Sequence, residues 1–143
     1  MNTLKKFGCL ILLISMGAVN AQNLSSHQWK DRILVVMTED TLNNTFQQQL
    51  LELEKNIHGL KERKLFVYLI QPTEFKKGLL SKSWQKNSTL FEKYKNSNSA
   101  FEIALIGLDG GIKLQQTDFL SCNKLFSMID MMPMRRAEMK KND

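Results

Sequence analysis

Cysteine is the most reactive side chain in this sequence, and one of its two copies lies outside the apolar N-terminal run. Cys9 falls within that run, and Cys122 lies near the C-terminus. Cys122 is in the first turn of a predicted helix, where amide dipoles favour a thiolate, so a thiol enzyme could use it. The residue also falls on the apolar face of that helix, and buried lone cysteines usually behave as small hydrophobic side chains. We therefore favour a structural role and keep Cys122 as a weak catalytic candidate.

A threonine and two acids follow the first predicted strand. Thr38, Glu39 and Asp40 come directly after an apolar run, at the edge where open α/β sheets bind ligands. The two acids could bind a cation or act as an acid–base pair, as in a hydrolase. The interpretation that we favour is capping and favourable charge at the N-terminus of the next helix.

Histidines and arginines supply the remaining ligand-binding candidates. His27 and His58 do not match the spacing of a metal site, so the sequence predicts neither a metal nor a cofactor. His27 and Trp29 are predicted to anchor the N-terminal lead-in against the domain. Arg135 and Arg136 could bind an anion or an acidic partner, although we favour a solvated tail.

The first 21 residues have the three parts of a secretory signal. Lys5 and Lys6 precede an apolar run over residues 7–19, and Ala21 marks the predicted cleavage site. The run is too short to span a bilayer comfortably, so no stable membrane span is expected after cleavage. The sequence predicts an exported protein, periplasmic or secreted, with an uncleaved N-terminal anchor as the alternative. Its Lys- and Asn-rich, Cys-poor composition is typical of a bacterium.

The charge balance argues against a nucleic-acid partner. The chain has a formal net charge of +6, which cleavage of the signal peptide with Lys5 and Lys6 lowers by two. Nucleic-acid-binding proteins usually have a stronger and more clustered excess of basic residues, interleaved with aromatic side chains.

Apolar patterning predicts a strand–helix–strand unit after the lead-in. The runs 33–37 and 65–70 are typical of strands buried on both faces. Asp40 or Thr41 is the predicted N-cap of the helix between them, and Gly59 its exit. The unit implies parallel pairing of the two strands. One amphipathic helix is predicted from apolar residues at intervals of three or four: Leu42, Phe46, Leu50, Leu53, Ile57 and Leu60.

The second half of the chain predicts a helix, a hairpin and a last helix. We expect a helix over 89–95, a hairpin turn at Asp109-Gly110-Gly111, and a helix that begins near Ser121 and stops at Pro133. The order β-α-β, α, β-hairpin, α predicts an α/β fold of thioredoxin-like layout, with helices on both faces of a four-stranded mixed sheet. The predicted parts are a signal peptide (1–21), one domain (22–134) and a charged C-terminal tail (135–143).

Three segments of the sequence resemble one family. They are the lead-in over 24–30, the hairpin over 106–114 and the closing segment over 129–136, which is the most specific. The family is a domain of unknown function in bacterial exported proteins, and it resembles the domain repeated in vertebrate extracellular proteins of the sushi-repeat and equarin type. The resemblance covers nearly all of the mature chain. It implies a thioredoxin- or peroxiredoxin-like fold and brings no reaction with it.

The usual chemistry of thioredoxin-fold enzymes is missing from the sequence. Those enzymes place a reactive cysteine just after the first strand, where residues 37–41 of this chain contain none. They also place a cis-proline before the hairpin strand, whereas residues 98–102 contain no proline. The leading hypothesis is therefore a non-catalytic module that binds a protein or surface partner. The alternative is a single-cysteine, peroxiredoxin-like oxidoreductase that uses Cys122.

Overall fold

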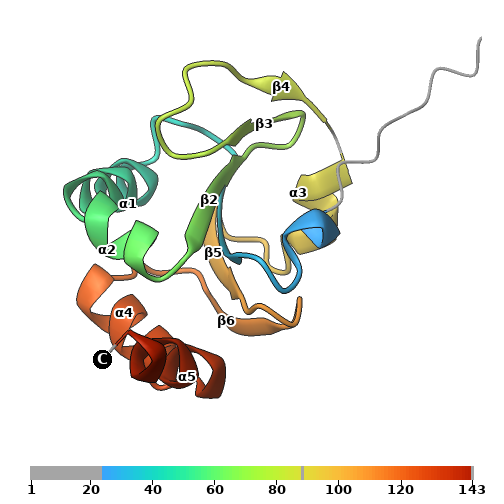
Figure 1. The fold of residues 1–143 in the computed structure, drawn as a ribbon. Helices are drawn as coiled ribbons and strands as arrows, with labels where there is room; N and C mark the ends of the chain where they lie inside the picture. The colour runs from blue at the N-terminus through green and yellow to red at the C-terminus, as the bar shows by residue number, and fades with distance from the viewer. Residues whose placement is uncertain (1–23, 88, 143) are drawn as a thin grey trace, which may run out of the picture.

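A six-stranded mixed sheet with helices on both faces forms the centre of the molecule (Figure 1). The structure is a computed structural model that describes residues 24–87 and 89–142. The predicted signal peptide, residues 1–21, lies outside this part of the chain. Among the described helices, none is long and apolar enough to cross a bilayer.

Helices and strands follow one another in short groups along the described chain. In chain order they are η1 (Leu24–His27), β1 (Arg32–Thr38), α1 (Asn44–Lys55), α2 (Ile57–Glu62), β2 (Leu65–Ile70), β3 (Glu74–Lys77), β4 (Gln85–Lys86), α3 (Thr89–Tyr94), β5 (Phe101–Ile106), β6 (Ile112–Gln116), α4 (Cys122–Asp130) and α5 (Pro133–Lys141).

Strand β1 lies inside the sheet, whose order is β4-β3-β2-β1-β5-β6. It pairs in parallel with β2 and antiparallel with β5, and β5 continues antiparallel into β6. The predicted strand–helix–strand unit and the predicted hairpin are therefore confirmed. All seven residues of β1 are buried, as expected for an apolar strand that is covered on both faces.

The sheet has six strands rather than the predicted four. The two additional strands, β3 and β4, extend it antiparallel beyond β2. They come from the Lys-, Ser- and Asn-rich segment between β2 and α3, for which the sequence predicts no strand. With four and two residues, they are too short to show an apolar alternation, and Phe75 is their one buried side chain.

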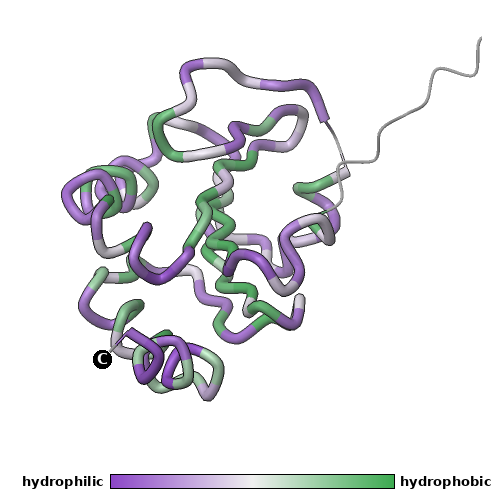
Figure 2. Tube along the Cα trace, in the orientation of Figure 1, coloured by the Kyte–Doolittle hydropathy of each residue, from purple (hydrophilic) through white to green (hydrophobic). Residues whose placement is uncertain are grey.

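Each face of the sheet has its own apolar core. Alternate residues of β1 point to opposite faces, so Leu34 and Val36 pack with α1, α2 and α4, whereas Ile33, Val35 and Met37 pack with η1 and α3. Figure 1 shows these two helical layers on opposite sides of the strands, and Figure 2 shows the concentration of hydrophobic residues along the sheet between them. The predicted two-faced covering is confirmed.

The helix predicted between β1 and β2 is divided into α1 and α2 at Asn56, whose backbone leaves the helical region. Leu42 is 80% exposed and precedes the helix, so its place in the predicted apolar stripe was wrong. Asn43, rather than Asp40 or Thr41, caps α1 by accepting a hydrogen bond from the Phe46 amide. Gly59 lies inside α2, where an added Cβ would stand 2.5 Å from the Phe126 ring, so close packing explains this glycine.

The C-terminal residues form helix α5 rather than the expected solvated tail. Pro133 occupies the start of this helix, where its missing N–H costs nothing. Arg135 is only 3% exposed and donates hydrogen bonds to the carboxylates of Asp130 and Glu62. These ion pairs compensate the buried charge, which is why a basic segment can pack against the domain.

A buried carboxylate organises the loop between α3 and β5. Glu102 is almost fully buried, and it accepts hydrogen bonds from the amides of Asn96 and Ser97, the Ser97 hydroxyl and the Gln115 side chain. Burial alone would raise the pKa of Glu102, but these hydrogen bonds outweigh it and hold the pKa below its usual range. The ionised form therefore stabilises the folded state.

We expect Glu102→Gln to lower the free energy of unfolding at pH 7 by about 2 kcal/mol, because buried donors lose a charged acceptor. A carboxyl group whose pKa is depressed on folding adds stability above its unfolded pKa of about 4.3 and loses it as the pH falls through the folded pKa. The difference between the variant and the wild type should therefore shrink between about pH 5 and pH 2. Urea titrations across this range measure it, with the exposed Asp118→Asn as control. A difference that does not depend on pH would contradict the assignment.

Candidate functional site

The edge beyond the carboxyl end of β1 is occupied by Thr38, Glu39 and Asp40. Thr38 is buried, and its hydroxyl donates to the Asp40 carbonyl and accepts from the Asp40 amide. The Asp40 carboxylate accepts from the Leu42 amide, and the Glu39 amide donates to the Ala100 carbonyl. The polar groups of this turn are thus largely engaged with one another, and the Glu39 side chain points to solvent. Within residues 24–87 and 89–142, no other acidic, basic or thiol side chain forms a hydrogen bond or ion pair with these three residues.

Cys122 lies at the N-terminus of α4 and faces the core. It is 1% exposed, and its thiol donates to the Glu52 carbonyl at 3.7 Å. The Glu52 carboxylate accepts from the Cys122 amide, and Ser121 caps the helix, so the helix N-terminus already has an anionic partner. Burial, together with the charge of Glu52, raises the pKa of Cys122 to about 11. The environment therefore opposes the thiolate that the helix position alone would favour.

A chain of hydrogen bonds holds the lead-in on the sheet. His27 Nδ1 lies 2.8 Å from the Asp31 carboxylate, and Nε2 lies 2.8 Å from the Tyr68 hydroxyl. Because a carboxylate only accepts, Nδ1 donates to Asp31, and in the tautomer that carries its one hydrogen on Nδ1 the Nε2 atom accepts from Tyr68. Burial, aided by the nearby Asp31 charge, raises the pKa of Tyr68 to about 12, so its hydroxyl stays protonated. His27 anchors the lead-in, as we predicted.

Trp29 does not share this anchoring role through its side chain. The indole is 63% exposed, and the residue has a left-handed backbone with φ 66°. Its amide instead donates to the Leu108 carbonyl at 2.7 Å, and neighbouring Gln28 donates to the Asp109 carbonyl. The lead-in and the hairpin are therefore joined by a backbone hydrogen bond from Trp29 and by a side-chain hydrogen bond from Gln28.

The three segments that carry the family resemblance meet at the amino end of β1. The lead-in contacts the hairpin turn as described, and the closing segment approaches the same turn from the other face. Between the hairpin and the start of α5 lies a cavity of about 320 Å³, lined in part by Arg32, Leu108 and Met132. Of the predicted basic pair, Arg135 is engaged in buried ion pairs, whereas the Arg136 side chain is exposed.

On the lead-in side, a second and more polar cavity opens next to β1. It measures about 380 Å³ and lies between η1, the end of α3 and the hairpin turn. Asp31, Lys93 and Tyr94 are among its polar lining residues, and Leu24 and Ile33 are among its apolar ones. Small-molecule sites are concave and combine apolar lining residues with a few polar groups that orient the ligand, and this cavity has both kinds of residue. We identify this cavity as the candidate functional site.

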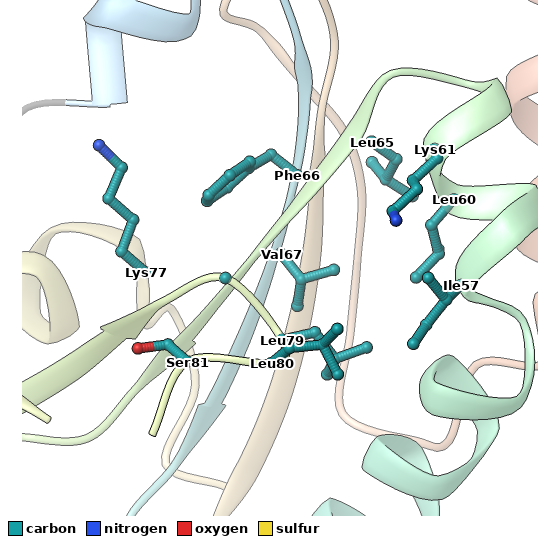
Figure 3. A pocket seen from close by; sticks show the side chains of 11 residues that line it. Ile57, Leu60, Lys61, Leu65, Phe66, Val67, Lys77, Leu79, Leu80 and Ser81 are labelled. Atoms are coloured by element: carbon teal, nitrogen blue, oxygen red, sulfur yellow. The ribbon is translucent and has the colours of Figure 1, made fainter. Parts of the chain in front are cut away.

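A third cavity, of about 340 Å³, is almost entirely apolar (Figure 3). It lies at the edge of β2, where Leu79 and Leu80 face Val67 and the helix α2, and the Lys77 ammonium points away from them. Its polar atoms are few, so it offers little for orienting a ligand. In the described ranges, no group of three or more His, Cys, Asp and Glu side chains is arranged to hold a metal ion.

Sequence reasoning missed Asp31, Tyr68, Lys93 and Tyr94. The spacing of four between His27 and Asp31 was a usable signal, since residues four apart meet within a helical turn. Tyr68 gave none, because it lies in an apolar strand and meets His27 across 41 positions. Lys93 and Tyr94 were read only as part of a helix.

We expect Tyr68→Phe to lower the free energy of unfolding by about 1–2 kcal/mol, because His27 Nε2 loses its donor while the aromatic packing is retained. Tyr94→Phe is the matched control, since the Tyr94 hydroxyl has no hydrogen bond to any described residue and its removal should cost about 0.5 kcal/mol or less. Urea titration of both variants measures the difference. Equal effects would contradict a specific bond between Tyr68 and His27.

The fold is similar to that of peroxiredoxins. A reduced 2-Cys peroxiredoxin of Plasmodium vivax matches with a TM-score of 0.58 and 12% identity, over 80% of this chain and 72% of its own. A mitochondrial 2-Cys peroxiredoxin of Plasmodium falciparum matches with a TM-score of 0.52 and 14% identity, over 75% and 78%. At such identities the likeness establishes the thioredoxin-like fold alone.

Sequence comparison supplies the family. No curated protein matches the chain. One family model, described as "Domain of unknown function (DUF4174)", matches residues 23–138, which include all three motif segments that meet around the hairpin. On this match, the chain belongs to the DUF4174 family.

Proposed function

We propose that this protein is an exported binding domain on a peroxiredoxin-like fold, without thiol chemistry, and that its ligand-binding face lies at the amino end of β1. The observation that carries the proposal is the contrast between the two ends of that strand. The carboxyl end is a turn whose polar groups bond to one another, whereas a polar cavity of about 380 Å³ opens at the amino end. A partner protein or surface molecule in the periplasm or outside the cell is the ligand we envisage.

The environment of Cys122 supports the non-catalytic assignment. A peroxidatic or exchanging thiol must reach its substrate and ionise near neutral pH. Cys122 is buried, its pKa is raised to about 11, and Glu52 holds the helix N-terminus that would have stabilised its thiolate. A single-cysteine, peroxiredoxin-like oxidoreductase is the alternative, and it requires this helix end to open.

Export and the relation to the vertebrate domains are part of the proposal. The lysine-led apolar run that ends at Ala21 supports export, and the motif segments support a common origin with the sushi-repeat and equarin domains. Both rest on sequence pattern.

Thiol labelling tests the absence of thiol chemistry. In the folded protein, we expect Cys122 to react with an alkylating reagent at least about 100-fold more slowly than after denaturation, because reaction requires the helix end to open. Asn123→Cys in a Cys122→Ala background places an exposed thiol on the same helix turn and should react quickly when folded. Fast native labelling of Cys122, with peroxide consumption that Cys122→Ala abolishes, would overturn the proposal in favour of the oxidoreductase.

Expression of the full chain in a Gram-negative host tests export. We expect a periplasmic or secreted product that begins at Gln22, because signal peptidase cleaves after the small residue Ala21. N-terminal sequencing of the fractionated protein identifies the first residue. Leu12→Arg interrupts the apolar run and should keep the protein in the cytoplasm. A wild-type product that retains Met1 and stays in the cytoplasm would refute export.

A further inference from the structure

Two opposite charges lie on the wall of the polar cavity without pairing with each other. Asp31 comes from the turn before β1, and Lys93 from the end of α3. Their charged atoms are farther apart than an ion pair allows, and Lys93 has no carboxylate partner among the described residues. Asp109 also borders the cavity, but its carboxylate is engaged by Lys113 and the Gly111 amide.

The Asp31 carboxylate is held in place by His27, and Asp31 lines the cavity. One oxygen accepts from His27 Nδ1 at 2.8 Å, and His27 is fixed in turn by Tyr68. The other oxygen has no hydrogen bond to any described residue, and the Asp31 side chain is 37% exposed. It therefore presents a positioned acceptor that a cationic or N–H donor group can approach without displacing a protein partner.

Two other residues that line the cavity carry donor groups. The Lys93 ammonium group lies 5.4 Å from the centre of the Tyr94 ring, which keeps the two side chains together. The Tyr94 hydroxyl has no partner among the described residues, and burial raises the pKa of Tyr94, so the hydroxyl remains a donor. Both groups suit a carboxylate. Aliphatic side chains complete the wall: Leu24, Ile33, Ile106 and Ile112.

We propose that this cavity binds a free aliphatic α-amino acid, with its ammonium group at Asp31, its carboxylate at Lys93 and Tyr94, and its side chain against the aliphatic wall. A zwitterion matches the two unpaired charges, which no singly charged ligand satisfies. The cavity volume of about 380 Å³ is at the small end of the range for ligand sites and suits a ligand of this size. The proposal rests on the assignment of the protein as a binding domain and specifies its ligand class.

Calorimetric titration of the full chain with L-leucine tests the proposal. Two analogues each remove one charge: leucinamide lacks the carboxylate, and N-acetyl-leucine lacks the ammonium group. We expect saturable binding of leucine and about tenfold weaker binding of either analogue, since one charged hydrogen bond is lost in each. Absence of saturable binding of leucine, or equal binding of all three compounds, would overturn the proposal.

Two variants locate each charge. Asp31→Asn keeps an acceptor for His27 but removes the negative charge. It should therefore abolish the preference for leucine over N-acetyl-leucine, and the preference for leucine over leucinamide should remain. Lys93→Gln should abolish the preference for leucine over leucinamide, and the preference for leucine over N-acetyl-leucine should remain. Lys77→Gln, at an exposed lysine outside this cavity, is the control and should leave both preferences unchanged. If both preferences survive in Asp31→Asn and Lys93→Gln, the ligand lies elsewhere and the site is wrong.

These readouts are separate from those of the proposed function. Thermal unfolding of each variant without ligand distinguishes a lost ligand contact from a damaged fold. Because Lys93 is exposed, Lys93→Gln should not change the melting temperature. Thiol labelling and peroxide consumption do not depend on the cavity. A chain that proves inert toward peroxide and does not bind leucine would refute the ligand class while leaving the binding-domain assignment intact.

Discussion

The rest of the structure depends on the complete burial of strand β1. A strand with every residue buried needs hydrogen-bond partners at both edges and apolar cover on both faces. The parallel strand β2 and the antiparallel strand β5 supply the partners, and the helices of the two layers supply the cover. Because β1 cannot shift relative to either neighbour, the positions of its two ends are determined, and the surface features next to those ends are positioned with it.

Those two ends have opposite characters. Beyond Thr38 the chain forms a turn in which side-chain and main-chain groups bond to one another, so little is left to interact with a ligand. Before Arg32, the Asp31 carboxylate, which His27 supports, and the end of α3 line the polar cavity. In this chain, whose fold is similar to that of peroxiredoxins, the polar cavity lies at the end of the sheet where the lead-in, the hairpin and the closing segment converge. The scaffold and the chemistry it supports are separable properties.

The sequence predicted the parts of the fold that local patterning controls. Apolar runs identified β1 and β2, an Asp-Gly turn identified the β5–β6 hairpin, and Ser121 marked the start of α4. Strands β3 and β4 were not predicted because strands this short show no alternation of apolar and polar residues. The burial of Arg135 was not predicted because one of its two carboxylate partners, Glu62, lies far away in the sequence. The same holds for the hydrogen bond between Tyr68 and His27. Local composition cannot reveal a charge that a distant carboxylate neutralises.

The pairing of Arg32 with Glu138 has a consequence for how the chain is made. Arg32 begins the central strand, is buried, and donates to the Arg63 carbonyl and to Glu138, 106 residues later. A buried arginine without its carboxylate is strongly destabilising. On the ribosome, residues up to β6 therefore emerge with every strand of the sheet but without the counterion that lets the first of them be enclosed. Vectorial synthesis thus keeps the nascent chain incompletely folded until helix α5 has been released.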